Sequence, residues 1–137
     1  MATRLNPYLS FRDNAREAME FYQSVFGGEL TVSTFAEFQM SQDPGDQDKI
    51  MHSQLEAGDL TLMASDTPAE MEYRSGTNFA VSLSGDDDAE LRGYWEKLSA
   101  DGQVVVPLEQ APWGDSFGQC IDRYGVGWMV NIAGPQG

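Results

Sequence analysis

The strongest constraint on the fold is an order of structural signals that occurs twice along the chain. The first half predicts a helix that begins after Asn14 and ends at Gly27 and Gly28, because glycine readily takes the left-handed conformation found at helix C-termini. Alternating apolar residues predict four strands in this half, at 5–11, 29–38, 50–57 and 59–65. The first half therefore follows the order β-α-β-β-β, with a final hairpin around Gly58-Asp59 and a polar loop at 39–49.

The second half repeats this order at a period of roughly 73 residues. Its helix is predicted to begin after Asp87 and to end at Asp101-Gly102. Its predicted strands lie at 78–84, 104–108, 117–122 and 127–132. Because either half alone is too small to bury the face of its sheet, we predict a single α+β domain. The domain spans 1–137, with modules at about 1–66 and 77–137 and a connection at about 67–76.

Both predicted helices carry an N-terminal signal and an apolar stripe. Asn14 with Glu17, and Asp87 with Glu90, have the spacing of a capping box. The apolar stripes consist of Ala18, Met19, Tyr22, Val25 and Phe26 in the first helix and Leu91, Tyr94, Trp95 and Leu98 in the second. They are expected to pack on the apolar strand faces, which carry Leu9, Phe11, Leu60, Leu62, Ala64, Phe79, Val81, Leu83, Trp128, Val130 and Ile132.

The opposite strand faces mix small, polar and a few large apolar side chains, which is typical of a small-molecule cavity. Trp113, in a predicted turn at 112–115, is a candidate for the cavity mouth or for packing against a partner subunit. A plain solvent-facing sheet is the alternative, but two methionines and a tyrosine on these faces are poor residues for open solvent. The candidate ligand-binding residues are Asn6, Tyr8, Ser10, His52, Gln54, Thr61, Met63, Ser65, Ala80, Trp113, Met129 and Asn131.

The charge balance and the cysteine content narrow the partners and the compartment. The chain has 8 Lys and Arg against 22 Asp and Glu, a formal net charge of −14, which repels nucleic acid and acidic lipid. A single cysteine, Cys120, permits neither an internal disulfide nor a cysteine-based metal cluster. The N-terminal residues lack the apolar core of a signal peptide, and no apolar run approaches the roughly 20 residues that span a bilayer. We therefore expect a cytoplasmic protein with no membrane or nucleic-acid partner.

Seven segments spread along nearly the whole chain carry a family resemblance. They are Asn6-Pro7-Tyr8-Leu9-Ser10-Phe11, Ala15-Arg16-Glu17-Ala18-Met19-Glu20-Phe21-Tyr22, Val25-Phe26-Gly27-Gly28, Lys49-Ile50-Met51-His52, Leu62-Met63-Ala64-Ser65-Asp66, Pro112-Trp113-Gly114-Asp115 and Asp122-Arg123-Tyr124-Gly125-Val126-Gly127-Trp128. With them the chain resembles the PhnB-like branch of the vicinal oxygen chelate superfamily, which holds glyoxalase I, bleomycin-resistance proteins and extradiol dioxygenases. The resemblance implies two βαβββ modules that form a half-open mixed β-barrel around a cavity, with the helices outside. It also implies a homodimer, which would cover exposed sheet edges.

Metal-using members of the superfamily place His, Glu or Gln ligands on the cavity faces. By the resemblance, those places fall on Asn6, Met63, Ala80 and Met129. Methionine and alanine supply neither imidazole nor hard oxygen ligands to a divalent ion. We therefore expect no metal and no cofactor, and no mechanism of the glyoxalase or dioxygenase type that depends on that ion.

The only histidine, His52, is the only general-base candidate, and the catalytic residues are otherwise unknown. His52 and Gln54 face the cavity if Met51 and Leu55 face the helices, and a structural role for His52 is the alternative. Three functions stay open at this point. The chain binds a small molecule in a metal-free cavity; or it is a lyase, isomerase or dioxygenase that uses His52 or a metal at non-standard positions; or it is a regulatory or assembly subunit.

Overall fold

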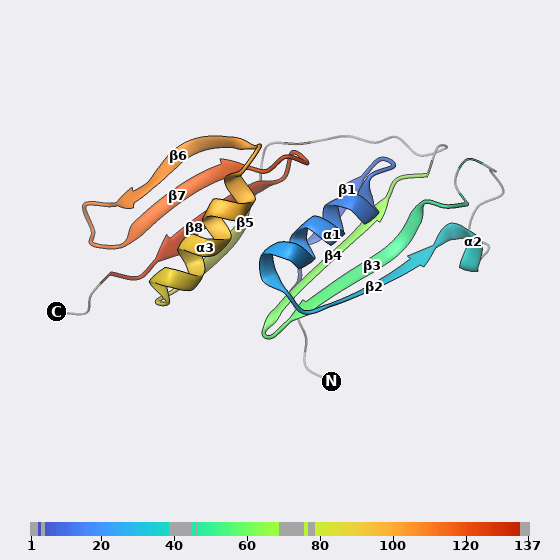
Figure 1. Ribbon diagram of the computed structural model, residues 1–137, viewed down its shortest axis with the longest axis horizontal. Helices are drawn as coiled ribbons and strands as arrows, with labels where there is room; N and C mark the ends of the chain where they lie inside the picture. Colours follow the sequence, from blue (N-terminus) through green and yellow to red (C-terminus); the bar gives the residue numbers. More distant parts are fainter. Residues whose placement is uncertain are drawn as a thin grey trace. The chain divides into compact units, whose positions relative to one another are not determined.

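The computed structural model describes residues 3, 5–38, 45, 47–68, 76 and 79–134. It has two compact units, Met1–Ser75 and Gly76–Gly137, and each is a four-stranded sheet with a long helix on one face (Figure 1). The first unit contains β1 (Tyr8–Phe11), α1 (Ala15–Phe26), β2 (Glu29–Thr34), α2 (Phe35–Phe38), β3 (Ile50–Ala57) and β4 (Leu60–Asp66). The second contains β5 (Val81–Gly85), α3 (Asp88–Ser99), β6 (Gln103–Gln110), β7 (Ser116–Ile121) and β8 (Gly127–Ile132). The predicted α+β class and the repeated β-α-β-β-β order are confirmed, with the short α2 as an addition.

The first sheet has the strand order β1-β4-β3-β2, in which β1 runs parallel to β4 and the other neighbours are antiparallel. α1 lies along this sheet (Figure 1), and Met19 and Tyr22 of its predicted apolar stripe are fully buried. Burying a large apolar side chain contributes about 1.5–3 kcal/mol. The strand residues buried in this unit include Leu9, Phe11, Ile50, Leu55, Leu62 and Ala64. This core fixes which face of the sheet is left uncovered by α1.

The two ends of α1 are stabilised in different ways. At its C-terminus the predicted glycine stop is confirmed, since Gly27 and Gly28 have φ values of 76° and 88°. A Cβ atom on Gly28 would lie 2.2 Å from the carbonyl oxygen of Glu56, so only glycine fits there. At the N-terminus the predicted cap, Asn14, makes no side-chain capping hydrogen bond. The prediction of a capping box at Asn14 is therefore wrong.

Asp66, at the end of β4, takes the place of the expected cap. It is 4% exposed, and its Oδ1 accepts a hydrogen bond from the backbone N–H of Ala15 at 2.9 Å. Its Oδ2 accepts one from the backbone N–H of Ile50, also at 2.9 Å. One buried carboxylate therefore joins the start of α1, the start of β3 and the end of β4, and it lies close to the positive end of the α1 dipole.

The strand predicted at 29–38 ends at Thr34, and residues Phe35–Phe38 form α2 instead. The Thr34 hydroxyl accepts a hydrogen bond from the N–H of Glu37 at 3.2 Å, and the Glu37 carboxylate accepts one from the N–H of Thr34 at 3.4 Å. This reciprocal pair is a capping box. The signal is present in the sequence as Thr-Phe-Ala-Glu, and the strand pattern obscured it.

A register shift beside Met51 changes which side chains of β3 join the core. His52 pairs with Ser33 but Ile50 pairs with Thr34, so β3 holds one residue more than β2 there, as in a β-bulge. Ile50 is fully buried, whereas Met51 is only half-buried. The expectation that Met51 points toward the helix is therefore wrong, because the bulge gives that place to Ile50.

The second sheet has the strand order β5-β8-β7-β6 and packs against α3. Trp128, Val130 and Ile132 of β8 are buried, as are Leu91 and Leu98 of α3, in agreement with the predicted faces. The prediction that Phe79 belongs to the strand face packed against the helix is wrong. Phe79 lies before the strand and is 62% exposed, because regular pairing with β8 begins only at Val81.

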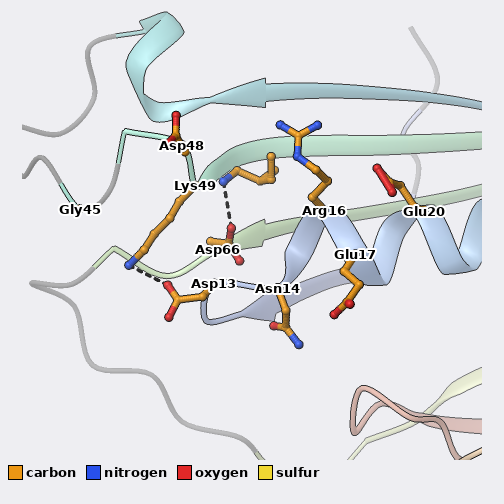
Figure 2. Close-up of a pocket in the computed structure, with 10 residues that line it drawn as sticks. Asp13, Asn14, Arg16, Glu17, Glu20, Gly45, Asp48, Lys49 and Asp66 are labelled. Carbon is orange, nitrogen blue, oxygen red and sulfur yellow. Dashed lines mark hydrogen bonds and ion pairs between the residues drawn. The ribbon is translucent and has the colours of Figure 1, made fainter.

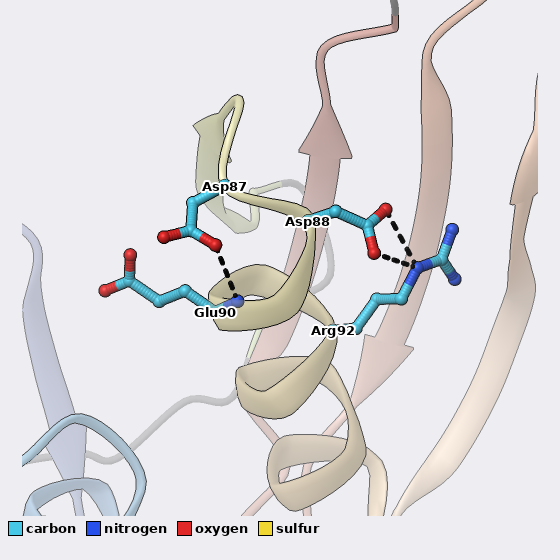
Figure 3. Close-up of polar contacts among 4 residues, drawn as sticks. All are labelled: Asp87, Asp88, Glu90 and Arg92. Atoms are coloured by element: carbon cyan, nitrogen blue, oxygen red, sulfur yellow. Dashed lines mark hydrogen bonds and ion pairs between the residues drawn. The ribbon is translucent and has the colours of Figure 1, made fainter.

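The N-terminus of α3 is capped by Asp87, the residue that the sequence predicts, through one half of the predicted capping box (Figure 3). Oδ1 of Asp87 accepts a hydrogen bond from the backbone N–H of Glu90 at 3.1 Å. One turn along, Asp88 holds Arg92 through an ion pair at 2.9 Å between residues four apart. Both carboxylates lie at the positive end of the helix dipole, where negative charge is favourable.

Asp122 is the buried carboxylate of the second unit. Its Oδ1 accepts hydrogen bonds from the N–H groups of Tyr124 at 2.8 Å and Val126 at 3.1 Å, and its Oδ2 accepts one from the Trp128 indole at 2.8 Å. The same side chain therefore closes the β7–β8 turn and satisfies the polar atom of the largest core residue.

β6 is one of the two edge strands of the second sheet, and its three valines are exposed: Val104, Val105 and Val106. Its ladder with β7 shifts register twice, between Val104 and Val106 and again between Val106 and Glu109. Pro107 lies within the second shift. Bulges and proline are features that hinder the pairing of an exposed edge with another chain.

Most of the predicted loop at 39–49 and of the predicted connection at 67–76 lies outside the described residues. Within the part of the chain that is described, no helix has the length and apolarity to cross a lipid bilayer.

Candidate functional site

The face of the first sheet that points away from α1 holds most of the sequence-predicted site residues. Alternation along the strands defines this surface, because Leu9, Leu55, Leu62 and Ala64 are buried and their neighbours are not. We call it the open face of the first sheet. Its residues are Tyr8, Ser10, Glu29, Thr31, Ser33, His52, Gln54, Glu56, Thr61, Met63 and Ser65.

Strand register sets the order of these side chains across the sheet. Tyr8 pairs with Met63, Met63 pairs with Gln54, and Gln54 pairs with Thr31. These four residues therefore form one row from β1 to β2, with the half-buried Met63 as the apolar member. Asn6, before β1, is half-buried but lies outside the paired strand.

Tyr8 and His52 contact each other although their strands are not neighbours. Tyr8 lies on β1 and His52 on β3, with β4 between them. The phenol oxygen is 3.4 Å from Nδ1 of His52, and the two ring centroids are 5.9 Å apart at an interplanar angle of 33°. The tyrosine side chain thus extends over β4. A 3.4 Å separation is long for a hydrogen bond, so the polar contact between these two side chains is weak.

The charges on this open face are all negative. Gln54 donates a hydrogen bond from Nε2 to Oε1 of Glu56 at 2.8 Å, which orients both side chains. Glu56 pairs across the strands with Glu29, so two carboxylates stand directly opposite each other. Such like-charge pairs are unfavourable in an isolated sheet. None of the strands in the described part of the chain carries a lysine or an arginine.

The site residues predicted in the second half lie on the second unit. Met129 and Asn131 are half-buried on β8, Ala80 is half-buried just before β5, and Trp113 is 67% exposed in the turn before β7. Asn131 donates a hydrogen bond from its amide to Asp115 at 3.1 Å. This bond fixes the orientation of the Asn131 side-chain amide.

Asp115 is itself fixed by two donors. The backbone N–H of Gly134 bonds to its Oδ1 at 2.8 Å, and the Asn131 amide bonds to its Oδ2. The Gly134 N–H, followed by the Asn131 amide, holds the pKa of Asp115 below its ordinary value. The carboxylate therefore stays charged and keeps Asn131 in place at neutral pH.

The side chains at the four positions to which the resemblance assigns metal ligands do not fit a divalent ion. Asn6 and Met63 lie in the first unit and Ala80 and Met129 in the second, and none of the four supplies an imidazole or a carboxylate. In the described residues no three His, Cys, Asp or Glu side chains gather in a group that could hold a metal.

A second feature of the first unit is a surface hollow of about 570 Å³ beside the start of α1 (Figure 2). Five carboxylates and two basic side chains line it, and none is a sequence-predicted site residue. Lys49 reaches across to Asp13 in an ion pair at 2.9 Å, and Asp66 is bonded to backbone N–H groups. These contacts connect the start of α1 to the start of β3, so the polar residues of the hollow stabilise the fold.

Sequence reasoning missed two kinds of polar residue. Glu56 follows the same alternation as His52 and Gln54, so the signal for placing it on the open face was present. Asp66 and Asp122 sit at strand ends, and their bonding partners could not be read from spacing alone.

Comparison with known proteins agrees with the observed fold. Residues 3–131 match the family model described as 3-demethylubiquinone-9 3-methyltransferase. The crystal structure of protein PA1353 from Pseudomonas aeruginosa is 38% identical, with 96% of this chain and 98% of that chain covered and a TM-score of 0.82. The PhnB protein from Bacillus cereus is 25% identical over 96% of this chain and 100% of its own, with a TM-score of 0.77.

A more distant structure extends the likeness to the wider fold. A glyoxalase/bleomycin resistance protein/dioxygenase family enzyme from Burkholderia phytofirmans PsJN is 14% identical over 92% of this chain and 94% of its own, with a TM-score of 0.61. At this identity the likeness concerns the fold alone, and a fold does not define an activity. The chain therefore belongs to the PhnB-like 3-demethylubiquinone-9 3-methyltransferase family and has the vicinal oxygen chelate fold.

Proposed function

We propose that this protein binds a small organic molecule, without a metal, on the open face of the first sheet. The observation that carries this proposal is the contact between Tyr8 and His52 above β4. An aromatic ring, an imidazole and the thioether of Met63 gather there on a sheet face that α1 does not cover. A few polar groups around an apolar surface are typical of ligand sites.

The residues at and around the contact between Tyr8 and His52 have separate parts in this proposal. Met63 offers a polarisable apolar surface to the body of the ligand. Gln54 is held by Glu56, so its amide presents a fixed hydrogen-bonding group. Tyr8, at the β1 end of the row, and His52, two residues before Gln54 on β3, provide a donor and an acceptor, in an arrangement set by the histidine tautomer.

The test is a screen of small organic compounds by thermal shift, followed by NMR mapping of each hit. Ligands are expected to shift the amide signals of β1, β3 and β4. Replacing His52 by Ala should weaken binding roughly fivefold to tenfold, the worth of one hydrogen bond, and leave cooperative folding intact. Glu20→Ala, on the exposed side of α1, is the matched control and should not change the affinity. Loss of folding in His52→Ala would instead assign that residue a structural role.

An enzyme that acts on a small metabolite is the second candidate. The observation in its favour is that the Tyr8 hydroxyl and His52 Nδ1, two groups able to exchange protons, lie 3.4 Å apart on an accessible face. A metal at non-standard positions is a weaker form of this candidate, because the described residues offer no cluster of ligands. Mass spectrometry of each hit after incubation separates the two: an altered compound, lost in His52→Ala, supports catalysis.

We also propose that the chain works as a homodimer in the cytoplasm. Leu5, Phe79 and Trp113 are large apolar side chains that are more than half exposed, and burial against a second copy would remove this apolar surface from water. The free, buried Cys120 suits a reducing compartment. Light scattering at micromolar concentration tests the assembly, and a monomeric mass would contradict it.

A further inference from the structure

The distribution of charge on the strands narrows the ligand class, if the open face binds a small molecule as proposed above. The described basic residues lie on helices or beside strand ends: Arg12, Arg16, Lys49, Arg92, Lys97 and Arg123. Arg12 follows β1, and Lys49, which precedes β3, is already paired with Asp13. The open face itself carries Glu29 and Glu56. A carboxylate or phosphate ligand would meet no strand-borne cation there, and it would meet repulsion from the two glutamates.

We propose that the open face selects a positively charged organic ligand: an amine joined to an apolar or aromatic body. The ammonium group lies at Glu56, whose carboxylate already faces Glu29 across the strands. A cation at this point offsets the repulsion between the two carboxylates, a gain that a neutral or anionic group cannot supply.

The strand geometry sets the size of this ligand. β1 and β3 flank β4, so the Tyr8 and Gln54 positions are about 10 Å apart across the sheet. Met63 lies between them in the same row, and Glu56 follows Gln54 along β3. A ligand with its ammonium at Glu56 would lay its body over Met63. Its apolar far end would reach Tyr8, whose exposed ring offers that end an aromatic surface.

The test uses three probes of matched shape and different charge: 3-phenylpropylamine, 3-phenylpropanol and 3-phenylpropanoate. Each is titrated into the protein at low ionic strength while the amide signals of β1, β3 and β4 are followed by NMR. The amine is expected to bind about threefold to tenfold more tightly than the propanoate, with the alcohol between them, and the difference should shrink at high salt.

Variants then locate the source of the preference. Glu56→Gln should remove most of the difference between the amine and the propanoate. Glu20→Gln removes the same charge from the exposed side of α1 and should leave the difference unchanged. A loss of selectivity that is equal in both variants would overturn the inference, because it would trace the preference to the net charge of −14 alone.

The outcomes also separate this inference from the proposed function. If all three probes shift the open-face signals with equal affinity, or if the propanoate binds best, the charge selection is wrong and the binding face stands. If none of the three shifts these signals at millimolar concentration, the proposed binding face fails, and the inference fails with it.

Discussion

Replacing Asp66 by Ala should destabilise the first unit far more than any change at the residue that the sequence marks as the helix cap. Asp66 is 4% exposed and accepts hydrogen bonds from the backbone N–H groups of Ala15 and Ile50, both at 2.9 Å. The substitution leaves both donors without a partner in a buried place. An unsatisfied buried N–H costs about 1–3 kcal/mol, so we expect a loss of about 3–4 kcal/mol of unfolding free energy after partial relaxation.

Two further substitutions calibrate this magnitude. Asp66→Asn keeps one carbonyl oxygen and turns an NH₂ group toward the other donor, so we expect a loss of about 1–3 kcal/mol. Asn14→Ala should change the stability by less than about 0.5 kcal/mol, because the Asn14 side chain makes no capping bond. The order Asp66→Ala, Asp66→Asn, Asn14→Ala is therefore the central expectation.

The assay must report on the first unit. Trp95, Trp113 and Trp128 are the three tryptophans of the chain, and all lie in the second unit, so intrinsic fluorescence follows that unit. Native-state amide exchange reports on the first unit and the second unit separately. In Asp66→Ala the protection of α1 and β3 amides should fall roughly 100-fold to 1,000-fold, the equivalent of 3–4 kcal/mol. Unchanged protection there, or a loss no larger than in Asn14→Ala, would refute the role of this carboxylate.

Three other predictions concern the second unit. Gly93→Ala should raise its stability by about 0.5–1 kcal/mol in urea unfolding, because Gly93 lies within α3 and a Cβ atom there meets nothing within 4 Å; a loss would contradict this. Burial, and then the Asp122 carboxylate, raises the pKa of Cys120 to about 11, so a thiol reagent at pH 8 should modify the native protein slowly and the urea-unfolded chain quickly. The hydrogen bond to Glu90 raises the pKa of Tyr94 to about 12 from 10.0. The stability that the protonated Tyr94 phenol contributes through this bond is therefore complete below pH 10 and is lost as the pH rises toward 12. NMR titration should show Tyr94 ionising at lower pH in Glu90→Gln.

Features that depend on neighbouring residues were predictable from the sequence. The apolar stripe of α1, the glycines at its end and the Asp87–Glu90 cap of α3 each lie within a few residues of one another, and each is observed. The repeated order of strands and helices follows from the same short-range patterns. This is why the fold class could be inferred without any knowledge of the partners of each strand.

Features that depend on strand pairing were not predictable. Ala15 and Asp66 are 51 residues apart in sequence, so no local pattern reveals that Asp66 and not Asn14 meets the start of the helix. The bulge beside Met51 breaks the alternation on which the assignment of faces relied. At the candidate site, alternation placed Tyr8 and His52 on one side of their strands. The contact between Tyr8 and His52 could be recognised only from the strand order, in which β4 separates β1 from β3.

The irregular ladder of β6 has a consequence for the resistance of the folded chain to aggregation. Three consecutive exposed valines on an edge strand, Val104 to Val106, form the kind of segment from which cross-β aggregates grow. Two register shifts and Pro107 interrupt the straight row of hydrogen-bonding groups that an incoming strand would need. The folded chain can therefore expose this apolar edge without offering a template for strand addition, and the repulsion between copies that each carry a net charge of −14 slows the encounters that lead to precipitation.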